Sequence, residues 1–332
     1  MLYFTGFILN NMLINIRRFL LFTLTISFYF SCSKSDSSPS VTPPAEVDTL
    51  NSWIKGNRIA SELEDVWFMD NKNGIAASST SLMSSSDSGN NWTVIAGTNS
   101  FGMINIQFLD GLLGFCQSTT QLGRTYDGGK TWKLKPLASG YGYTFQFITP
   151  ALGFYNDFSK GIYKTVDSGN TWKLVLDGSG KGPNFIFDFL DSLTGFTMIN
   201  ANCSKTIDGA VTWQPLATSI TSGNFGNYFR MQFIDTLTGY CGTPDGLFKT
   251  SDGGKTWNNK LVRATTFMIP DFMDASHGYC IAANTLYRTD DGGNNWTISC
   301  KMGQDDFSGM HFLDMNTGWA STFGGYVLRL HP

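Results

Sequence analysis

The sequence has few charged residues, and no stretch of it is strongly basic. Asp, Glu, Lys and Arg make up 15% of the 332 residues, and the formal net charge is -3. Without a run of Lys and Arg, the chain lacks the positive stripe that binds a phosphate backbone. Nucleic acid is therefore not an expected partner.

The sequence also lacks the richness in Ala, Glu, Lys and Leu that is typical of helical proteins. It contains instead 36 glycines, and aromatic residues make up 14% of the chain. Short strands separated by turns have this composition. An all-β fold is therefore favoured.

No apolar run is long enough to cross a membrane. The run FLLFTLTISFYF (19–30) follows two arginines and is shorter than the about 20 residues that a spanning helix needs. This arrangement is typical of an export signal. Its ending YFSC (29–32) resembles a lipobox, so we expect residues 1–31 to be a lipoprotein signal peptide and Cys32 to be lipidated. A buried or free Cys32 is the alternative.

The segment SKSDSSPSVTPPAEVDT (33–49) is rich in Ser and Pro and poor in apolar residues. Such a segment cannot bury enough surface to fold. We therefore expect residues 32–50 to be a disordered tether, and residues 51–332 to be a folded domain. The tether would hold this domain at the bacterial cell envelope, by a lipid anchor in the outer membrane.

The cysteines do not indicate a disulfide framework. Cys116, Cys241 and Cys280 each follow an aromatic residue at the same point of a repeated pattern, and Ala320 occupies that point in another repeat. A position occupied by Cys in three repeats and by Ala in another is typical of small, buried side chains. Cys280 and Cys300 would lie two strands apart, about 10 Å, which exceeds the about 7 Å that a bridge spans between Cα atoms. We expect free thiols.

Known catalytic and cofactor motifs are missing. The sequence contains no HExxH, GxSxG, phosphate-binding loop or GxGxxG pattern. His277, His311 and His331 occupy dissimilar positions, and TDDGG (289–293) lacks the spaced carboxylates of a calcium loop. We expect no metal and no cofactor.

Two patterns repeat along the chain. The first, close to T-x-D-G-G-x-T-W, is called the Asp turn below and occurs at 85–92, 125–132, 165–172, 206–213, 250–257 and 289–296. The second contains F-x-D, or F-x-T in one copy, and ends in Gly; it occurs at 66–74, 106–114, 145–153, 187–195, 231–239, 270–278 and 310–318. Each repeat of about 40 residues is one supersecondary unit.

Each unit is predicted to contain four strands, A to D. Four-stranded sheets repeated at this spacing indicate a β-propeller. The last unit ends after its third strand, whereas Trp53 precedes Phe68 by the same interval that separates Trp132 from Phe147. We therefore predict a seven-bladed β-propeller with four-stranded blades, closed by pairing the N-terminal strand into the last blade.

The Asp turn is predicted to be a structural device. Its carboxylate would accept backbone N–H bonds across the turn between strands C and D, Gly would allow positive φ, and Trp would pack on the sheet. A basic residue precedes five of the turns and is expected to be solvated. These residues are Arg124, Lys164, Lys205, Lys249 and Arg288.

Together the two patterns resemble the photosystem II assembly factor-like propellers of the BNR/Asp-box superfamily, over residues 51–332. Similar turns occur in sialidases, xyloglucan-active hydrolases and sortilin-type receptors, so the resemblance indicates fold more than function. It implies a binding scaffold that uses an arginine patch on one face. Only Arg230 and Arg263 fall near the corresponding loops of this sequence.

The connections from strand D to the next strand A share one face and vary in length, which is typical of binding loops. Their aromatic residues suit a protein segment or a glycan. The alternative is that about half of them pack inward. The candidate ligand-binding residues are Tyr141, Tyr143, Tyr228, Phe229, Arg230, Phe267 and Phe307.

A second candidate site is the polar position before the repeated Phe in strand A. It is occupied by Trp67, Gln107, Gln146, Asp188, Gln232, Asp271 and His311. These side chains would gather near the axis and hydrate it. As the alternative, Asp188 and Asp271 would serve a glycoside hydrolase or lyase as acid and base, if about 6.5–9.5 Å apart. We predict a non-catalytic, monomeric scaffold that binds a protein or glycan.

Overall fold

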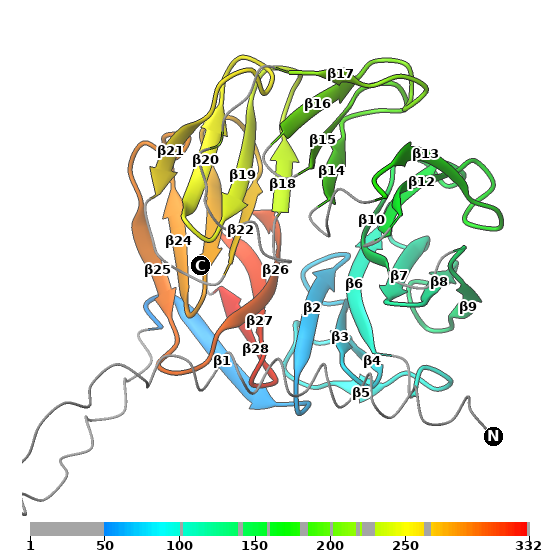
Figure 1. The fold of residues 1–332 in the computed structure, drawn as a ribbon. Helices are drawn as coiled ribbons and strands as arrows, with labels where there is room; N and C mark the ends of the chain where they lie inside the picture. Colours follow the sequence, from blue (N-terminus) through cyan, green and yellow to red (C-terminus); the bar gives the residue numbers. More distant parts are fainter. Residues whose placement is uncertain are drawn as a thin grey trace, which may run out of the picture. The chain divides into compact units, whose positions relative to one another are not determined.

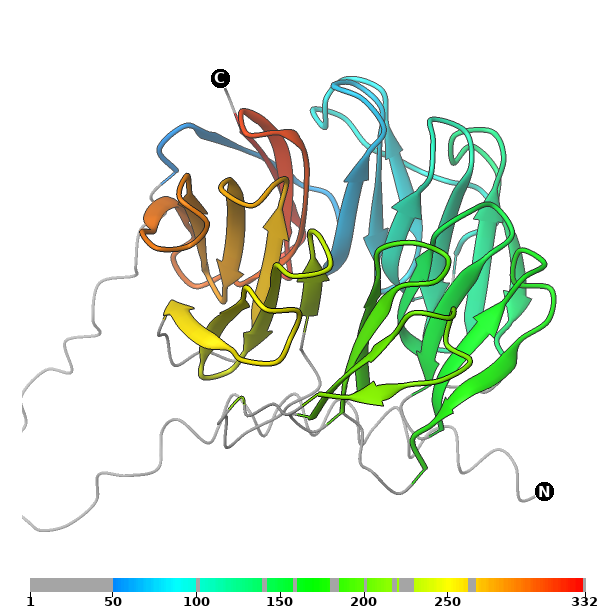
Figure 2. The same ribbon diagram turned by 90° about the horizontal axis from the view of Figure 1, so that it is seen from above.

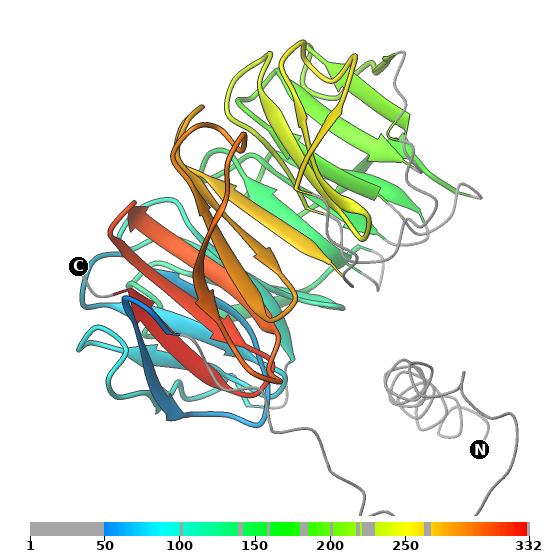
Figure 3. The same ribbon diagram turned by 90° about the vertical axis from the view of Figure 1, so that its left-hand side faces the viewer.

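The computed structural model describes residues 50–99, 102–138, 142–157, 160–179, 185–199, 202–216, 220, 230–261 and 267–330. These residues form seven four-stranded antiparallel sheets, arranged as blades about one axis (Figures 1 and 3). The predicted seven-bladed, all-β propeller is confirmed. No helix of the described residues is long and apolar enough to span a membrane. The predicted signal peptide, the predicted lipidation site Cys32 and the predicted tether up to residue 49 lie outside the described residues.

The blades are numbered in chain order, and each contributes one strand to each of four concentric positions. The innermost strands are β2 (Leu63–Phe68), β6 (Met103–Phe108), β10 (Gly142–Phe147), β14 (Phe185–Phe189), β18 (Arg230–Phe233), β22 (Met268–Phe272) and β26 (Phe307–Asp314). The second strands are β3 (Gly74–Ser78), β7 (Gly114–Ser118), β11 (Gly153–Asp157), β15 (Gly195–Ile199), β19 (Gly239–Thr243), β23 (Gly278–Ala282) and β27 (Thr317–Thr322).

The two outer positions complete each blade. The third strands are β4 (Leu82–Ser85), β8 (Gln121–Thr125), β12 (Gly161–Thr165), β16 (Asn202–Thr206), β20 (Gly246–Thr250), β24 (Thr285–Thr289) and β28 (Tyr326–Leu330). The outermost strands are β5 (Thr93–Val94), β9 (Lys133–Pro136), β13 (Lys173–Asp177), β17 (Gln214–Pro215), β21 (Asn258–Leu261), β25 (Thr297–Lys301) and β1 (Trp53–Arg58).

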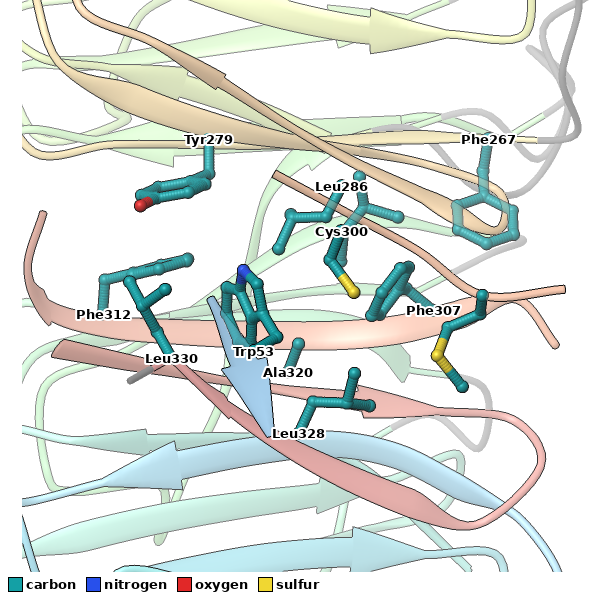
Figure 4. Packing of buried hydrophobic residues seen from close by; sticks show 12 residues of the cluster. Trp53, Phe267, Tyr279, Leu286, Cys300, Phe307, Phe312, Ala320, Leu328 and Leu330 are labelled. Carbon is teal, nitrogen blue, oxygen red and sulfur yellow. The ribbon is translucent and has the colours of Figure 1, made fainter. Parts of the chain in front are cut away.

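The seventh blade joins both ends of the described chain, because β1 pairs antiparallel with β28 and lies beside the C-terminal strands (Figure 2). Trp53 pairs with Leu330 and is 3% exposed. Its indole N–H donates to Ser299 Oγ of the sixth blade at 2.9 Å, and Figure 4 shows the ring near Phe312 and Cys300. The predicted closure is confirmed.

The repeated Phe of each innermost strand explains the glycine that ends the pattern. Phe147 stacks on Phe115 of the preceding blade, with ring centroids 3.5 Å apart. The same ring covers Gly153, where a Cβ atom would lie 2.7 Å from Phe147 Cδ1. Only glycine leaves room for the ring at this close approach. Aromatic stacking between blades therefore depends on both residues of the pattern.

The Asp turns have the hydrogen bonds predicted for them. In the second blade, Asp127 Oδ1 accepts the Thr131 N–H at 2.9 Å, and Gly129 has a φ of 83°. The Trp132 indole donates to the Gly129 carbonyl at 3.0 Å. Corresponding carboxylate bonds close the other turns. The structural role of this turn is confirmed.

The five cysteines of the described residues are free and buried. Burial raises the pKa of the thiols of Cys116, Cys241 and Cys280 well above the ordinary value. They are therefore uncharged, and the prediction of small buried thiols is confirmed.

Candidate functional site at the propeller axis

The residues before the repeated Phe are here called the axial residues, and three of them are glutamines that join neighbouring blades. Gln107 donates from Nε2 to the Phe147 carbonyl at 2.9 Å, and its Oε1 accepts the Phe147 N–H at 2.7 Å. Gln146 and Gln232 make the same two bonds to the Phe of the next blade. These carboxamides thus bind protein backbone rather than only hydrating the axis.

Asp188 occupies the same position in the fourth blade. Its Oδ2 accepts the Phe233 N–H at 2.6 Å, and its Oδ1 accepts a bond from Gln146 Nε2 at 2.8 Å. Burial raises the pKa of Asp188 to about 6 even though these bonds favour the carboxylate. Burial also raises the pKa of Asp271 to about 6.

The ring of axial residues closes through two aromatic side chains. Trp67 and His311 stack with centroids 4.0 Å apart and planes 24° apart. Burial lowers the pKa of His311 to about 4, opposed by its hydrogen bond with the Phe68 backbone. His311 is therefore a neutral packing residue at physiological pH.

A second group of polar side chains lies two residues earlier on the innermost strands. Asp65 accepts the N–H of Ile106 and of Val66, each at 2.9 Å. Asn105 Nδ2 donates to the Tyr143 carbonyl at 2.6 Å. Because innermost strands begin where the D-to-A connections end, this group marks one end of the axis. We call that end the connection face.

Arg230 reaches across the axis at the connection face. It belongs to the fifth blade, and its Nη2 donates to Asn105 Oδ1 of the second blade at 3.3 Å. Burial raises the pKa of Asp65 to about 7, against the opposing effects of its two N–H bonds and of Arg230. The charge of Asp271 also raises the pKa of Asp65. Asp65, Asn105, Arg230 and Asp271 form the axial cluster.

The predicted ligand-binding residues have different surroundings. Tyr143 is 37% exposed, and its backbone carbonyl accepts the hydrogen bond from Asn105. Arg230 is half-buried in the axial cluster. Phe267 and Phe307 are buried in the core cluster that contains Trp53, so their rings pack rather than face solvent. Tyr141, Tyr228 and Phe229 lie outside the described residues.

Asp65 and Asn105 were not among the residues predicted from the sequence. Side chains in a strand alternate with a period of two. A polar residue two positions before an axial residue should therefore face the same side, and this signal would have found both residues. The hydrogen bond between Arg230 and Asn105 joins residues 125 positions apart. No local pattern in the sequence reveals such a contact.

The basic residues before the Asp turns are not simply solvated, and that expectation was wrong. Arg124 Nη1 donates to the Ser168 carbonyl at 3.1 Å, and Lys164 Nζ donates to the Gly209 carbonyl at 2.7 Å. Each acceptor belongs to the Asp turn of the next blade. These residues are half-buried and join the blades far from the axis, as the axial glutamines do near it.

One buried carboxamide is unlike the others. Both polar atoms of Gln117 are buried, and neither has a hydrogen-bond partner among the residues described. Its Nε2 lies against Gly142, where a Cβ atom would come within 2.1 Å. The described part of the chain has no group of three His, Cys, Asp or Glu side chains that could hold a metal ion.

No protein-family model and no curated protein matches this sequence, but solved propellers resemble the structure. A structure of YCF48 bound to D1 peptide has a TM-score of 0.67 at 18% identity, covering 87% of this chain and 99% of that one. YCF48 from Cyanidioschyzon merolae gives 0.66 at 17%, covering 85% and 99%. The GH74 xyloglucanase from Xanthomonas campestris gives 0.62 at 12%, covering 82% and 52%. At such identities the likeness is one of fold.

Proposed function

We propose that the propeller is a non-catalytic scaffold that binds a protein segment at its connection face, with Arg230 and Tyr143 in contact with the partner. The observation that carries this proposal is the guanidinium of Arg230, which extends from one blade to the opposite side of the axis at this face. A planar, charged donor group held between blades is suited to backbone carbonyls or carboxylates. The similar propeller with a bound peptide supports a protein partner.

The position of Asp188 favours binding over catalysis. Both of its oxygens accept hydrogen bonds from protein groups. A general acid must present its proton to the substrate within hydrogen-bond reach, and Asp188 is directed at the neighbouring blades instead. The carboxylate therefore serves the assembly of the ring.

A glycoside hydrolase or lyase is the second candidate, because three carboxyls near the axis have raised pKa values. These are Asp65, Asp188 and Asp271. Groups of this kind are a frequent feature of active sites, and 52% of the xyloglucanase chain has a similar fold.

Capture of partners from native envelopes tests the scaffold proposal. Arg230→Gln and Tyr143→Ala should each lower recovery of a specific partner about tenfold or more, because contact residues of this kind contribute about 2 kcal/mol. Lys255→Gln, in the Asp turn of the fifth blade, is the matched control and should change nothing. Asp188→Asn combined with Asp271→Asn should leave capture intact. Polysaccharide turnover that this double variant abolishes, with capture unaffected by Arg230→Gln, would replace the scaffold with the hydrolase.

We also propose that the chain acts as a monomeric lipoprotein of the bacterial envelope, at the outer membrane. The support is the YFSC sequence at Cys32 and the Ser/Pro-rich segment after it. Cys32→Ala should move the protein from the membrane to the soluble fraction and abolish palmitate labelling. Unchanged fractionation and labelling would contradict the anchor and leave the scaffold proposal intact.

A further inference from the structure

Sulfur-containing side chains gather at one blade boundary, between the fourth and fifth blades. Met198 and Cys203 are opposite each other on β15 and β16, and Met231 and Cys241 are opposite each other on β18 and β19. Directly opposed residues of an antiparallel pair point to the same side of the sheet. All four residues belong to one buried core cluster, to which each blade thus contributes one methionine and one cysteine. We call these four residues the sulfur cluster.

The sulfur atoms of the two blades are close to one another. The Cys241 thiol donates to Met198 Sδ across the boundary at 3.9 Å. Cys203 Sγ also reaches the fifth blade, where it lies 3.0 Å from the position that a Cβ atom would occupy on Gly254. The two thiols interact electrostatically, because Cys203 adds to the effect of burial in raising the pKa of Cys241. Three sulfur atoms therefore lie together between the two sheets.

The other blades show that the fold does not require sulfur at these positions. The second and third strands pair in the same register in every blade, so equivalent residues can be identified. The position of Met198 has no sulfur in any other blade. The position of Cys203 is aliphatic in all of them, as Leu82, Leu122, Ile162, Leu247, Leu286 and Val327.

A disulfide does not fit this arrangement. Cys203 and Cys241 belong to two sheets that pack face to face, and such sheets lie about 10 Å apart. A disulfide spans at most about 7 Å between Cα atoms, and both cysteines are free. An ion between two sulfur atoms spans a wider gap, because two metal–sulfur bonds of about 2.3 Å separate the sulfur atoms by up to about 4.6 Å.

The separation of the sulfur atoms suits a metal ion with three sulfur ligands. Three bonds of about 2.3 Å in one plane place the sulfur atoms about 4 Å apart, and Cys241 Sγ is 3.9 Å from Met198 Sδ. Thiolates and thioethers together select Cu(I). Zinc takes four ligands from cysteine, histidine and carboxylate side chains, and the sulfur cluster supplies only two of these.

The surroundings favour a monovalent ion. Apolar side chains of the same core cluster enclose the sulfur atoms, among them Phe196, Phe233 and Phe248, and a net charge buried there would be costly. Burial raises the pKa of both thiols, so the loss of two protons is unfavourable. A Cu(I) ion bound to one thiolate has no net charge, and a thiol and a thioether add none.

We propose that the sulfur cluster binds one Cu(I) ion, which joins the fourth blade to the fifth. One of the two thiols, Cys203 or Cys241, releases its proton to solvent and forms a sulfur–copper bond. The other thiol and the thioether of Met198 bind through lone pairs, and nothing is oxidised or reduced. Because the ligands are buried, the ion enters when the boundary between these blades opens transiently. The site is separate from the axial cluster and does not depend on the proposed scaffold function.

Copper retention by the full chain tests the proposal, measured without oxygen by competition with the Cu(I) chelator bicinchoninate after long incubation. The wild-type protein should retain one Cu(I) per chain. Cys203→Val and Cys241→Ala should each abolish this retention. Both changes introduce residues that stand at the equivalent positions of the seventh blade, Val327 and Ala320, so both variants should melt close to the wild-type temperature. Met198→Ile should weaken retention.

Cys116→Ala and Cys280→Ala are the matched controls. These thiols occupy the position of Cys241 in the second and sixth blades, where they pack with Leu82 and Leu247 in place of a second cysteine. Both controls should retain copper as the wild type does, and Cys32 is unchanged in every variant. X-ray absorption of the loaded protein should show only sulfur bound to copper. Equal retention by Cys203→Val and Cys116→Ala, or nitrogen or oxygen ligands on the copper, would overturn the proposal.

Discussion

At the scale of single residues, the same carboxamide group can stabilise or destabilise the fold, depending on its hydrogen-bond partners. Gln107 satisfies a backbone N–H and C=O of the next blade, whereas Gln117 is buried with neither polar atom bonded to any described residue. A net hydrogen bond stabilises modestly, but a buried polar group without a partner is costly. The two residues therefore form a natural pair for comparison.

We predict that Gln107→Met lowers the free energy of unfolding by about 1–3 kcal/mol, because it leaves the Phe147 backbone groups without partners. Gln117→Met, a change of similar volume, should leave stability unchanged or raise it by about 1 kcal/mol. Urea denaturation of both variants measures the difference. A clear loss of stability in Gln117→Met would show that this carboxamide has a partner beyond the described residues.

The contacts of these residues could not be predicted from the sequence. The polar character of the axial position was evident, but its partners depend on how one blade is rotated against the next. The same holds for Arg230 and Asn105, which meet across the axis. Arg124 and Lys164 were misjudged for this reason too, because their acceptors lie in neighbouring blades.

At the scale of elements, local patterns determine each blade and were sufficient to predict it. The Asp turn encloses its own hydrogen bonds within a few residues, and the spacing of Trp53 from Phe68 predicted that β1 completes the last blade. The lengths of β5 and β17, two residues each, were not predictable because outermost strands have little packing to define their ends.

The closure leads to a prediction with an adjacent control. Trp53→Ala should lower the free energy of unfolding by about 3–5 kcal/mol, since Trp53 is buried between blades. Ile54→Ala should cost much less, because Ile54 is 45% exposed on the same strand. Deleting residues 51–58 should lower the melting temperature sharply. Equal stability of the two point variants would contradict the role of β1 in closing the ring.

At the scale of the whole molecule, the half-buried carboxyls near the axis make stability depend on pH. Burial raises the pKa of Asp65 to about 7 and of Asp188 and Asp271 to about 6, from an ordinary value of 3.8. Between these limits the folded state holds protons that the unfolded chain has released. The contribution of these carboxyls to the free energy of unfolding is therefore complete below about pH 4 and is lost as the pH rises through 6 to 7.

We predict that the free energy of unfolding falls between pH 5 and pH 8. His311 opposes this trend below pH 6.5, because its pKa is lowered to about 4, but three carboxyls outweigh one imidazole. Urea titrations at several pH values measure the slope, and Asp65→Asn should make it shallower. Stability that rises steadily up to pH 8 would be inconsistent with protonated carboxyls in the folded state.

The proposed scaffold function requires that a partner binds at the connection face beside Arg230. A photoreactive amino acid in place of Tyr143, irradiated in native envelopes, tests it most directly. The control has the same amino acid in place of the exposed Lys72, in the turn between β2 and β3 at the opposite end of the propeller. We expect a specific cross-linked partner at position 143, lost when Arg230→Gln is added. Cross-linking at position 72 alone, or at 143 regardless of Arg230, would contradict it.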